Sequence, residues 1–388
     1  MKPKNNNKKT LRIFGWASFL NDMGSDMIYP LWPIFVTSVL GAPMAALGFI
    51  DGLGEAIVSV SQAASGYLSD RFKKKKLFIW LGYLFGGLSR IGYAFSTTWQ
   101  HIIPLRVLDR AGKIRGAPRD AMVADLSTQE NRGKHFGFLR MMDNGGAVVG
   151  ILVSILLLGT LGYKNLFLLA ALPSLAAVFL VLFFIKDQPK TTTHVFKGLQ
   201  FKDLSSPLKL FTLLSAIFTL GSFSYSFLLV FAEQAGFKVV FVPILYLIFT
   251  AVASLFSYPF GSLSDRIGRK KVLFLAFLFW GLVCANFIFL DTKFFLVIGF
   301  ILFGLHKGAL EAVQRAFVTE LAPAEYRASI LGGFQMVIGL SALPASFLAG
   351  LLWDQFGMAT PFYFGIAMTI VAMILLGFVK DGTVNRST

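Results

Sequence analysis

The sequence has little of what a soluble enzyme uses. It contains one cysteine and four histidines in 388 residues, and only 14% of its residues are charged. The single cysteine, Cys284, excludes an internal disulfide bond and a cysteine-based metal cluster. Soluble domains are about 45 to 50% apolar and about 25% charged, whereas this chain is 55% hydrophobic. The composition therefore excludes an ordinary cytosolic enzyme, and we expect neither a metal site nor another cofactor.

Long apolar runs dominate the chain instead. Twelve runs are close to or above the roughly 20 mostly apolar residues that a membrane-spanning helix needs. They cover residues 11–40, 44–69, 77–97, 102–125, 133–158, 165–185, 210–233, 240–264, 272–290, 294–320, 328–353 and 362–379. Connections such as 41–43 are so short that the spans they join must be antiparallel neighbours. We predict an all-α membrane protein with twelve transmembrane helices in a lipid bilayer.

The basic residues are distributed unevenly between the two ends of these spans. The chain carries 36 Lys and Arg against 20 Asp and Glu, a net charge of +16. Only three basic residues, Lys164, Lys238 and Lys293, fall in connections on the side opposite to the termini. Because cytoplasmic connections are enriched in Lys and Arg, we predict that both termini are cytoplasmic and that the membrane is the plasma (inner) membrane. The charge is then a signal of topology, so we expect no nucleic-acid partner.

A polar segment and an internal repeat divide the chain into halves. We predict a flexible cytoplasmic tail at 1–10, a six-helix bundle at 11–185, a cytoplasmic linker at 186–209, a second six-helix bundle at 210–380 and a tail at 381–388. The loop GYLSDRFKKKK at 66–76 recurs as GSLSDRIGRKK at 261–271, 195 positions later. An even number of spans separates the copies, so the halves are parallel repeats about an axis along the membrane normal.

The repeated loop resembles the signature G-x-L-x-D-R-x-G-R-K-K of the major facilitator superfamily. The second copy matches it fully, and the first has Lys73 in place of the second glycine. The resemblance implies two pseudo-symmetric six-helix bundles that transport a small molecule by alternating access, with these loops as a cytoplasmic gate. The matching gate residues are Gly66, Asp70, Arg71, Gly261, Asp265, Arg266, Gly268 and Arg269. We expect the first glycine of each copy to allow close helix packing and the aspartate to face a helix N-terminus of the other half. The alternative is a basic cytoplasmic loop with an incidental acid.

Two weaker signatures lie in the first half. The segment RVLDRAG at 106–112 resembles the span-four motif R-V-L-Q-G, whose arginine is implicated in proton coupling in the family. The segment GAVVG at 146–150 resembles the antiporter motif G-P-x-x-G, with Ala147 in place of the proline that kinks the helix. Five glycines recur at packing intervals in the same span and predict close helix contact. They are Gly133, Gly137, Gly145, Gly146 and Gly150.

Charged residues inside the spans are the candidates for function. The basic ones are Arg90, Arg106, Arg110, Lys113, Arg115, Arg119, Arg140, Lys307 and Arg315. A charge at the bilayer centre costs at least about 2.5 to 3.5 kcal/mol on insertion scales, so each should face protein or water and have a partner. Asp51, Arg90 and Arg106 lie at a similar depth, roughly 10 Å from one membrane face at 1.5 Å per residue. Their depth allows these three to form one cluster, and we interpret Asp51 with Arg90 as a static ion pair.

The remaining charges suit a solvated central site. In the family fold, the first, fourth, seventh and tenth helices line the central cavity. Our candidates for proton coupling and the central cavity are Asp22, Asp26, Arg106, Asp109, Arg110, Lys113, Asp143, Tyr225, His306, Lys307 and Glu311. We expect Asp26, and next Asp22, to gain and lose a proton while neighbouring cations hold an anionic or polar substrate. Residues four apart, such as Asp109 and Lys113, share a helix face. The alternative is a set of static ion pairs.

Our interpretation is a secondary active transporter that moves a small organic solute and is driven by the proton gradient, without a bound cofactor. No Walker motif is present, so ATP is not its energy source. Efflux of a drug or metabolite is slightly favoured; import of an organic anion or a metal chelate is the alternative. A membrane receptor or regulatory protein of the same fold is the alternative from another class. We expect a monomer that is not an enzyme, and the sequence leaves the substrate open.

Overall fold

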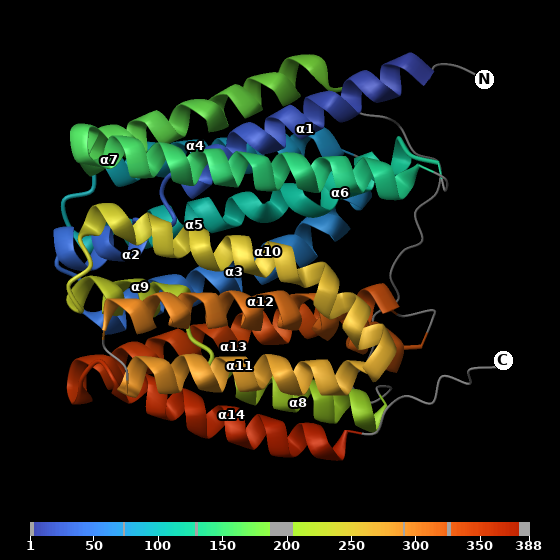
Figure 1. Cartoon of the computed structure of the whole chain (residues 1–388). Coiled ribbons are helices and arrows are strands. Elements are labelled where there is room, and N and C mark those ends of the chain that lie inside the picture. Colours follow the sequence, from blue (N-terminus) through green and yellow to red (C-terminus); the bar gives the residue numbers. More distant parts are fainter. Residues whose placement is uncertain are drawn as a thin grey trace. The chain divides into compact units, whose positions relative to one another are not determined.

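The computed structural model describes residues 4–72, 74–128, 131–186, 205–289, 292–323 and 327–379, and the statements below concern these residues. Every regular element in these ranges is a helix (Figure 1). The longer helices are α1 (Lys4–Asp26), α3 (Met44–Phe72), α4 (Lys75–Ala94), α5 (Ile102–Ala111), α6 (Gly116–Asp125), α7 (Arg132–Phe184), α8 (Ser206–Gly221), α9 (Tyr225–Gln234), α10 (Val242–Ile267), α11 (Arg269–Phe289), α12 (Lys293–Leu321), α13 (Arg327–Phe356) and α14 (Thr360–Phe378). The short helices are α2 (Trp32–Ile34), η1 (Phe35–Val39), η2 (Trp99–His101), η3 (Gly112–Arg115) and η5 (Val239–Phe241). The prediction of an all-α membrane protein is confirmed.

These helices account for the twelve predicted spans. By length and composition, eight helical segments are apolar enough to cross a membrane, one of them being the long 133–184 segment. That segment contains two spans, because Gly162 adopts φ +66° and interrupts the helix. The predicted spans that this criterion omits are 11–40, 77–97 and 102–125, which carry much of the intramembrane charge. Helix α1 begins at Lys4, so residues 4–10 are helical and the predicted flexible tail is wrong there.

The chain divides into two compact units. Unit 1 consists of Met1–Ala42, Ile57–His194 and Val239–Pro243, and unit 2 of Pro43–Ala56, Val195–Lys238 and Ile244–Thr388. The boundary passes through α3, whose first part belongs to unit 2 and whose last part belongs to unit 1. Most of the predicted linker at 186–209 and the tail at 381–388 lie outside the described residues.

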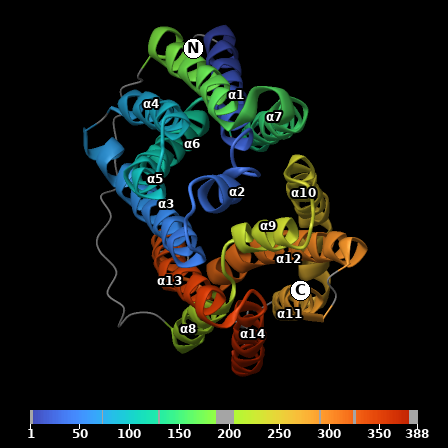
Figure 2. The same cartoon turned by 90° about the vertical axis from the view of Figure 1, so that its left-hand side faces the viewer.

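Unit 1 is organised around α1, which lies along α7 (Figure 2). A Cβ atom added at Gly146 would lie 2.2 Å from the Phe19 carbonyl oxygen, and one at Gly150 would lie 2.2 Å from that of Met23. Only glycine allows the two backbones to approach this closely. The predicted glycine packing is therefore confirmed at these two positions. It is wrong at Gly133 and Gly137, where an added Cβ would meet nothing within 4 Å.

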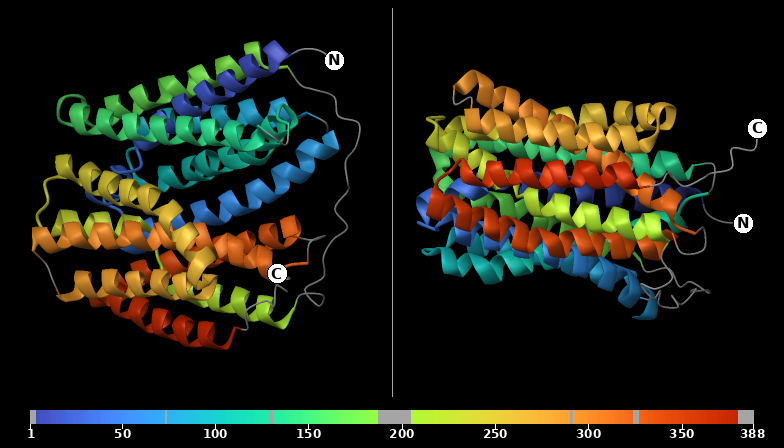
Figure 3. Two further views of the ribbon diagram at one scale, coloured as in Figure 1. Left: turned by 45° about the vertical axis from the view of Figure 1, so that its right-hand side comes forward. Right: turned by 90° about the horizontal axis from the view of Figure 1, so that it is seen from below.

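Unit 2 is held together by aromatic side chains. Helices α8, α11 and α14 lie side by side (Figure 3). Between them, the rings of Phe218 and Phe277 stack with centroids 4.1 Å apart, and those of Phe287 and Phe362 stack at 5.2 Å. The indole of Trp280 is fully buried and donates a hydrogen bond of 3.0 Å to the Gly221 carbonyl. Aromatic pairs of this kind add about 0.5 to 1.5 kcal/mol beyond the area they bury.

Three predicted spans are broken near their centres. In span four, η3 separates α5 from α6. In span seven, α8 ends at Gly221 and α9 starts at Tyr225, and the Ser224 hydroxyl accepts a hydrogen bond from Ser226 N at 3.2 Å as the N-cap of α9. In span one, α1 ends at Asp26 and the chain continues through α2 and η1. The candidate site residues Asp26, Lys113 and Tyr225 lie at these breaks.

Candidate functional site

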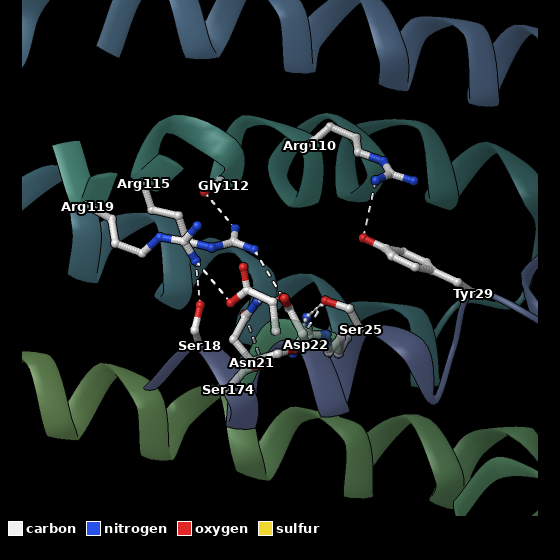
Figure 4. Close-up of polar contacts among 12 residues, drawn as sticks. Ser18, Asn21, Asp22, Ser25, Tyr29, Arg110, Gly112, Arg115, Arg119 and Ser174 are labelled. Carbon is white, nitrogen blue, oxygen red and sulfur yellow. Dashed lines mark hydrogen bonds and ion pairs between the residues drawn. The ribbon is translucent and has the colours of Figure 1, made fainter. Parts of the chain in front are cut away.

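Four buried arginines follow span four through unit 1. They are Arg106, Arg110, Arg115 and Arg119, and none is more than 7% exposed. They recur at spacings of four, five and four residues, and the second spacing runs through η3. We call them the arginine column. The matching contacts come from α1 and the segment after it, in antiparallel order. Ser18, Asp22 and Tyr29 contact Arg119, Arg115 and Arg110 (Figure 4). Trp32 contacts Arg106.

The end of the column at α6 is paired with carboxylates. Arg119 donates a hydrogen bond to the Ser18 hydroxyl and forms an ion pair of 3.3 Å with Asp143. The Asp143 carboxylate also pairs with Arg140 at 3.4 Å. The predicted site residue Asp143 therefore pairs with arginines and not with Lys113. At this end of the column, the positive charge of Arg119 therefore has a carboxylate partner.

The middle of the column contains a weaker ion pair. Arg115 lies 3.8 Å from the Asp22 carboxylate (Figure 4). It also donates a hydrogen bond of 2.9 Å to the Gly112 carbonyl, which ties it to the helix break. Asp22 accepts a bond of 2.9 Å from the neighbouring Asn21 amide, and its side chain is 24% exposed. The carboxylate of Asp22 is thus accessible and held by a long ion pair.

The other end of the column is covered by aromatic rings. The Arg110 guanidinium donates a hydrogen bond of 3.2 Å to the Tyr29 hydroxyl and lies 4.9 Å from the centre of that ring. Arg106 lies 4.3 Å from the centre of the Trp32 ring. Asp109 pairs with both arginines, at 3.9 Å to Arg106 and 3.7 Å to Arg110. A desolvated guanidinium over an aromatic face gains about 2 kcal/mol.

Arg90 of α4 is also buried in unit 1, but its hydrogen bonds go to neutral groups. It donates to the Ser25 hydroxyl at 2.6 Å and to the carbonyls of Asn21 and Ala170, each at 3.4 Å. Asp51 belongs to unit 2, so its predicted cluster with Arg90 and Arg106 stays a prediction. There the Asp51 carboxylate accepts hydrogen bonds from Ser224, at 2.8 Å, and from Ser226.

Two predicted site residues stand at the helix breaks of unit 1. Asp26 is the last residue of α1 and is half-buried. Lys113 is half-buried in η3, and among the described residues it has neither a hydrogen bond nor an ion pair. The 3₁₀ turn there removes the regular α-helical spacing that would pair it with Asp109.

The candidates of unit 2 are less charged. The ring of His306 is fully buried, with Nδ1 2.8 Å from the Ala276 carbonyl and its centroid 5.5 Å from that of Trp280. The ammonium of Lys307 lies 5.8 Å from the centre of the Phe303 ring. Tyr225 packs against the Tyr246 and Phe249 rings, and Glu311 is exposed. His306 and Lys307 belong to unit 2, and their place in the central cavity stays a prediction.

Sequence reasoning missed the role of Asp51. It is a buried carboxylate held by two hydroxyls across the break in span seven. The available signal was the cluster Ser222, Ser224 and Ser226 in an otherwise apolar span. The predicted depth of Asp51 in the membrane suggested Arg90 as its neighbour. Depth does not say which helices lie next to each other.

The second copy of the repeated loop forms contacts within unit 2. Helix α10 ends at Ile267, and Gly268 adopts φ +97°, the conformation that suits glycine at a helix C-terminus. Arg269 pairs with Asp265 at 3.1 Å and with Glu320. The Asp265 carboxylate is 65% exposed, and Arg266 is exposed. An added Cβ at Gly261 would meet nothing within 4 Å, so the structure does not show the close packing predicted there.

The first copy is described only in part. Gly66 and Asp70 lie in α3, but their side-chain surroundings are outside the described residues, as is residue 73. Arg71 is exposed in the last turn of α3. The gate contacts between halves that we expected for Asp70 and Asp265 stay predictions.

The fold and these buried charges define a class of protein: a polytopic membrane protein with ionisable groups inside its helical bundle. Residues 14–256 and 210–387 match the model of the Major Facilitator Superfamily. The chain is 36% identical over 381 residues to an uncharacterized MFS-type transporter, MJ1317, of Methanocaldococcus jannaschii, covering 96% of this chain and 95% of that protein. This chain therefore belongs to the major facilitator superfamily, a family of secondary transporters and not of enzymes.

Other similarities agree with this assignment. The chain is 26% identical over 400 residues to the multidrug resistance protein MdtG of Proteus mirabilis, with 96% of each chain covered. Its fold superposes on a crystal structure of a variant of the nucleoside transporter NupG with a TM-score of 0.82, at 16% identity, over 95% of this chain and 98% of that one. At this identity the structural similarity shows the fold alone. The twelve-span architecture is confirmed.

Titratable and cationic side chains make up this arrangement. Among the described residues, no group of His, Cys, Asp and Glu is arranged to hold a metal ion. The long Asp22–Arg115 pair, the half-buried Asp26 and the half-buried Lys113 are instead groups whose charge or partner can change. They lie beside the breaks in spans one and four of unit 1.

Proposed function

We propose that this transporter couples export of a small organic solute to proton entry, and that the coupling carboxylates are Asp22 and Asp26 in unit 1. The transporter is a multi-pass plasma (inner) membrane protein with both termini in the cytoplasm, and it works as a monomer. Asp109, Asp143 and the arginine column organise the site around these two groups. For Tyr225, His306, Lys307 and Glu311 of unit 2, a place in the central cavity stays a prediction.

The observation that carries the proton-coupling proposal is the Asp22–Arg115 pair. Its 3.8 Å separation and the 24% exposure of Asp22 mean that the ion pair is accessible and weakly held. Asp143 differs, because it pairs with two arginines at 3.3 and 3.4 Å and is buried. A substrate group that binds the ionised Asp22 carboxylate competes with the proton for the same oxygen atoms, so the proton must leave before the substrate binds. Proton and substrate then occupy the site in turn, as coupling of export to proton entry requires.

The proposed direction of transport rests on the sequence similarity to MdtG. MdtG, 26% identical over nearly the whole chain, is named a multidrug resistance protein, which supports export. The second candidate is import of an organic anion, which the cations along span four favour. The predicted gate loops do not distinguish export from import. Flux measured in vesicles that hold the transporter in one known orientation distinguishes export from import.

A ligand screen followed by flux measurement tests the proposal. Purified protein is first screened by thermal shift against metabolites, siderophores, sugars and drugs, since a ligand at 100 times its Kd stabilises by about 2.7 kcal/mol. Flux of the identified ligand is then measured in liposomes with an imposed pH gradient. We expect Asp22→Asn and Asp26→Asn to keep ligand binding and to lose acceleration by the gradient.

Asp125→Asn is the matched control. Asp125 forms an ion pair of 3.2 Å with Lys75 in the same unit, at the end of α6 and away from the helix breaks. We expect its flux to respond to the gradient as the unmodified protein does. If Asp22→Asn and Asp26→Asn both retain full gradient-driven flux, these carboxylates do not couple protons.

A further inference from the structure

An open groove lies between α4 and the second part of α7 in unit 1. Its volume is about 430 Å³, and it is lined by Ile91 of α4 and by residues of α7 that include Leu168, Leu172 and Leu175. The two helices pack closely beside it, because a Cβ atom added at Gly87 of α4 would lie 3.0 Å from the Leu175 side chain. The volume lies within the range of about 300 to 1,000 Å³ that is typical of small-molecule sites.

The groove opens toward the hydrocarbon core of the bilayer. Leu172 at its rim is 60% exposed, and Phe179 and Phe183 further along α7 are 54% and 70% exposed. Apolar side chains that are exposed on a membrane-spanning helix face the lipid tails, which are as apolar as leucine. An apolar space offers water no hydrogen-bond partners and stays dry. An acyl chain is therefore the group that fills this groove.

One end of the groove is polar and positively charged. Among the described residues that line the groove, only Asn165 is polar. Lys164 precedes it, and its ammonium lies 5.1 Å from the centre of the Phe95 ring. Phe95 directly follows α4 and comes one helical turn after Ile91, so both helices bring the lysine to the same end of the groove.

The charge of Lys164 is available to a ligand. The side chain is exposed, and among the described residues it forms no ion pair. The segments that meet at this end contain no acidic residue, since neither 91–108 nor 144–186 includes Asp or Glu. A lysine near a membrane surface attracts anionic headgroups. The groove thus combines an apolar length with a cation at one end.

We infer that this groove binds an anionic phospholipid, with one acyl chain along α7 and the phosphate group at Lys164. The chain fills space that water leaves empty, and the phosphate oxygens accept hydrogen bonds from the ammonium. A zwitterionic phosphatidylcholine can place its chain in the same groove, but it brings a choline cation next to the lysine. The site therefore selects lipids by headgroup charge.

Fluorescence quenching by brominated lipids tests this inference. Ala176→Cys puts a reporter thiol on an exposed position beside Leu175, twelve residues and roughly 18 Å along the helix from Lys164. The thiol carries bimane, and the protein is placed in nanodiscs of unbrominated phosphatidylcholine. Phosphatidylglycerol or phosphatidylcholine with brominated acyl chains is then added in increasing amounts. We expect the phosphatidylglycerol to give half-maximal quenching at about one-fifth of the mole fraction, the selectivity that one lysine near a membrane surface provides.

Two substitutions of lysine isolate the role of the headgroup. Lys164→Gln in the reporter protein should abolish the preference for phosphatidylglycerol. Lys293→Gln is the matched control, because Lys293 is also exposed and lies 5.9 Å from the centre of the Phe237 ring, but it belongs to unit 2 and does not line the groove. Its substitution should leave the preference unchanged. Cys284 is fully buried and stays in place, and the signal of the protein without the reporter is subtracted.

A further substitution tests the groove itself. Leu168→Phe occupies part of the groove and should reduce the preference at least twofold; Leu172→Phe at the exposed rim replaces it if that variant fails to fold. Equal half-maximal mole fractions for the two lipids, or a preference that survives Lys164→Gln, would overturn the inference. A preference that both phenylalanine variants retain would also overturn it, because the lysine would then attract headgroups without a bound chain. Quenching does not require transport, so the result is independent of proton coupling at Asp22 and Asp26.

Discussion

The two units of this transporter are built from the same repeat but use different interactions in their interiors. Unit 1 buries five arginines and two aspartates among its described residues: Arg90, Arg106, Arg110, Arg115, Arg119, Asp109 and Asp143. The described part of unit 2 buries Asp51 and His306 but no Lys or Arg, and its interior is filled with aromatic rings. The two repeats share the order of helices and the loop, whereas among the described residues the buried arginines all lie in unit 1.

The repeat register makes this difference specific. At an offset of 195 positions, the arginine column corresponds to Ile301, Leu305, Leu310 and Gln314 of α12. The four arginine positions of the first repeat are thus occupied by three aliphatic residues and one amide in the second repeat. A bundle with paired charges requires that every partner be present, whereas an aromatic core requires that volume be filled. The units should therefore respond differently to substitution.

The largest expected effect is loss of aromatic packing in unit 2. Trp280→Ala should lower the free energy of unfolding by about 3 to 5 kcal/mol, because it leaves a cavity and removes a buried hydrogen bond. Unfolding in mixed micelles with increasing sodium dodecyl sulfate measures this loss. Trp280→Phe retains most of the ring volume and should cost about 1 kcal/mol. Equal losses for both variants would mean that the hydrogen bond to Gly221, and not packing, stabilises unit 2.

Removal of a buried charge in unit 1 sharpens the comparison. Arg119 and Arg140 both pair with Asp143, at 3.3 and 3.4 Å, but their side chains are 9% and 62% exposed. Arg119→Met should cost about 3 kcal/mol, because the buried carboxylate loses its enclosed partner. Arg140→Met should cost less than about 1 kcal/mol, as exposed ion pairs do. The same unfolding assay compares the two variants, and equal costs would contradict a role for buried charge in unit 1.

The close contact between the backbones of α1 and α7 gives the smallest of these expected losses of stability. Gly150→Ala should destabilise by about 1 to 3 kcal/mol, because its Cβ would lie 2.2 Å from the Met23 carbonyl oxygen and force α1 away from α7. Gly159→Ala in the same helix adds a Cβ with no atom within 4 Å and should leave stability unchanged or slightly raised. Thermal unfolding in detergent is sufficient to detect the difference. A neutral Gly150→Ala would show that the helices can separate without cost.

Much of this architecture could be predicted from local pattern. The apolar runs located the twelve spans, and the gap between 158 and 165 anticipated the break at Gly162. The glycines at 146 and 150 were correctly identified as packing positions, whereas those at 133 and 137 have the same spacing and face open space. Spacing alone cannot separate these cases, because it does not say where along the helix a neighbour comes close.

The pairing of charges was predicted less well. Depth suggested Arg90 and Arg106 as neighbours of Asp51 but gave no sign of its hydrogen bonds to Ser224 and Ser226, more than 170 positions along the chain. Asp109 and Lys113 were expected to share a face, but η3 interrupts the helix between them. Each residue advances the side-chain direction by about 100°, so a short change in helix type redirects every group after it.

The order of residues by itself determined that this chain is a helical membrane protein made of two repeats, since hydropathy, loop charge and the duplicated loop are local properties. The tertiary structure decided which cation meets which carboxylate, which glycines touch a neighbouring helix, and that the buried charge is concentrated in unit 1. The physical reason is that a partner comes from a distant helix, whose rotation and breaks are set by packing of the whole unit.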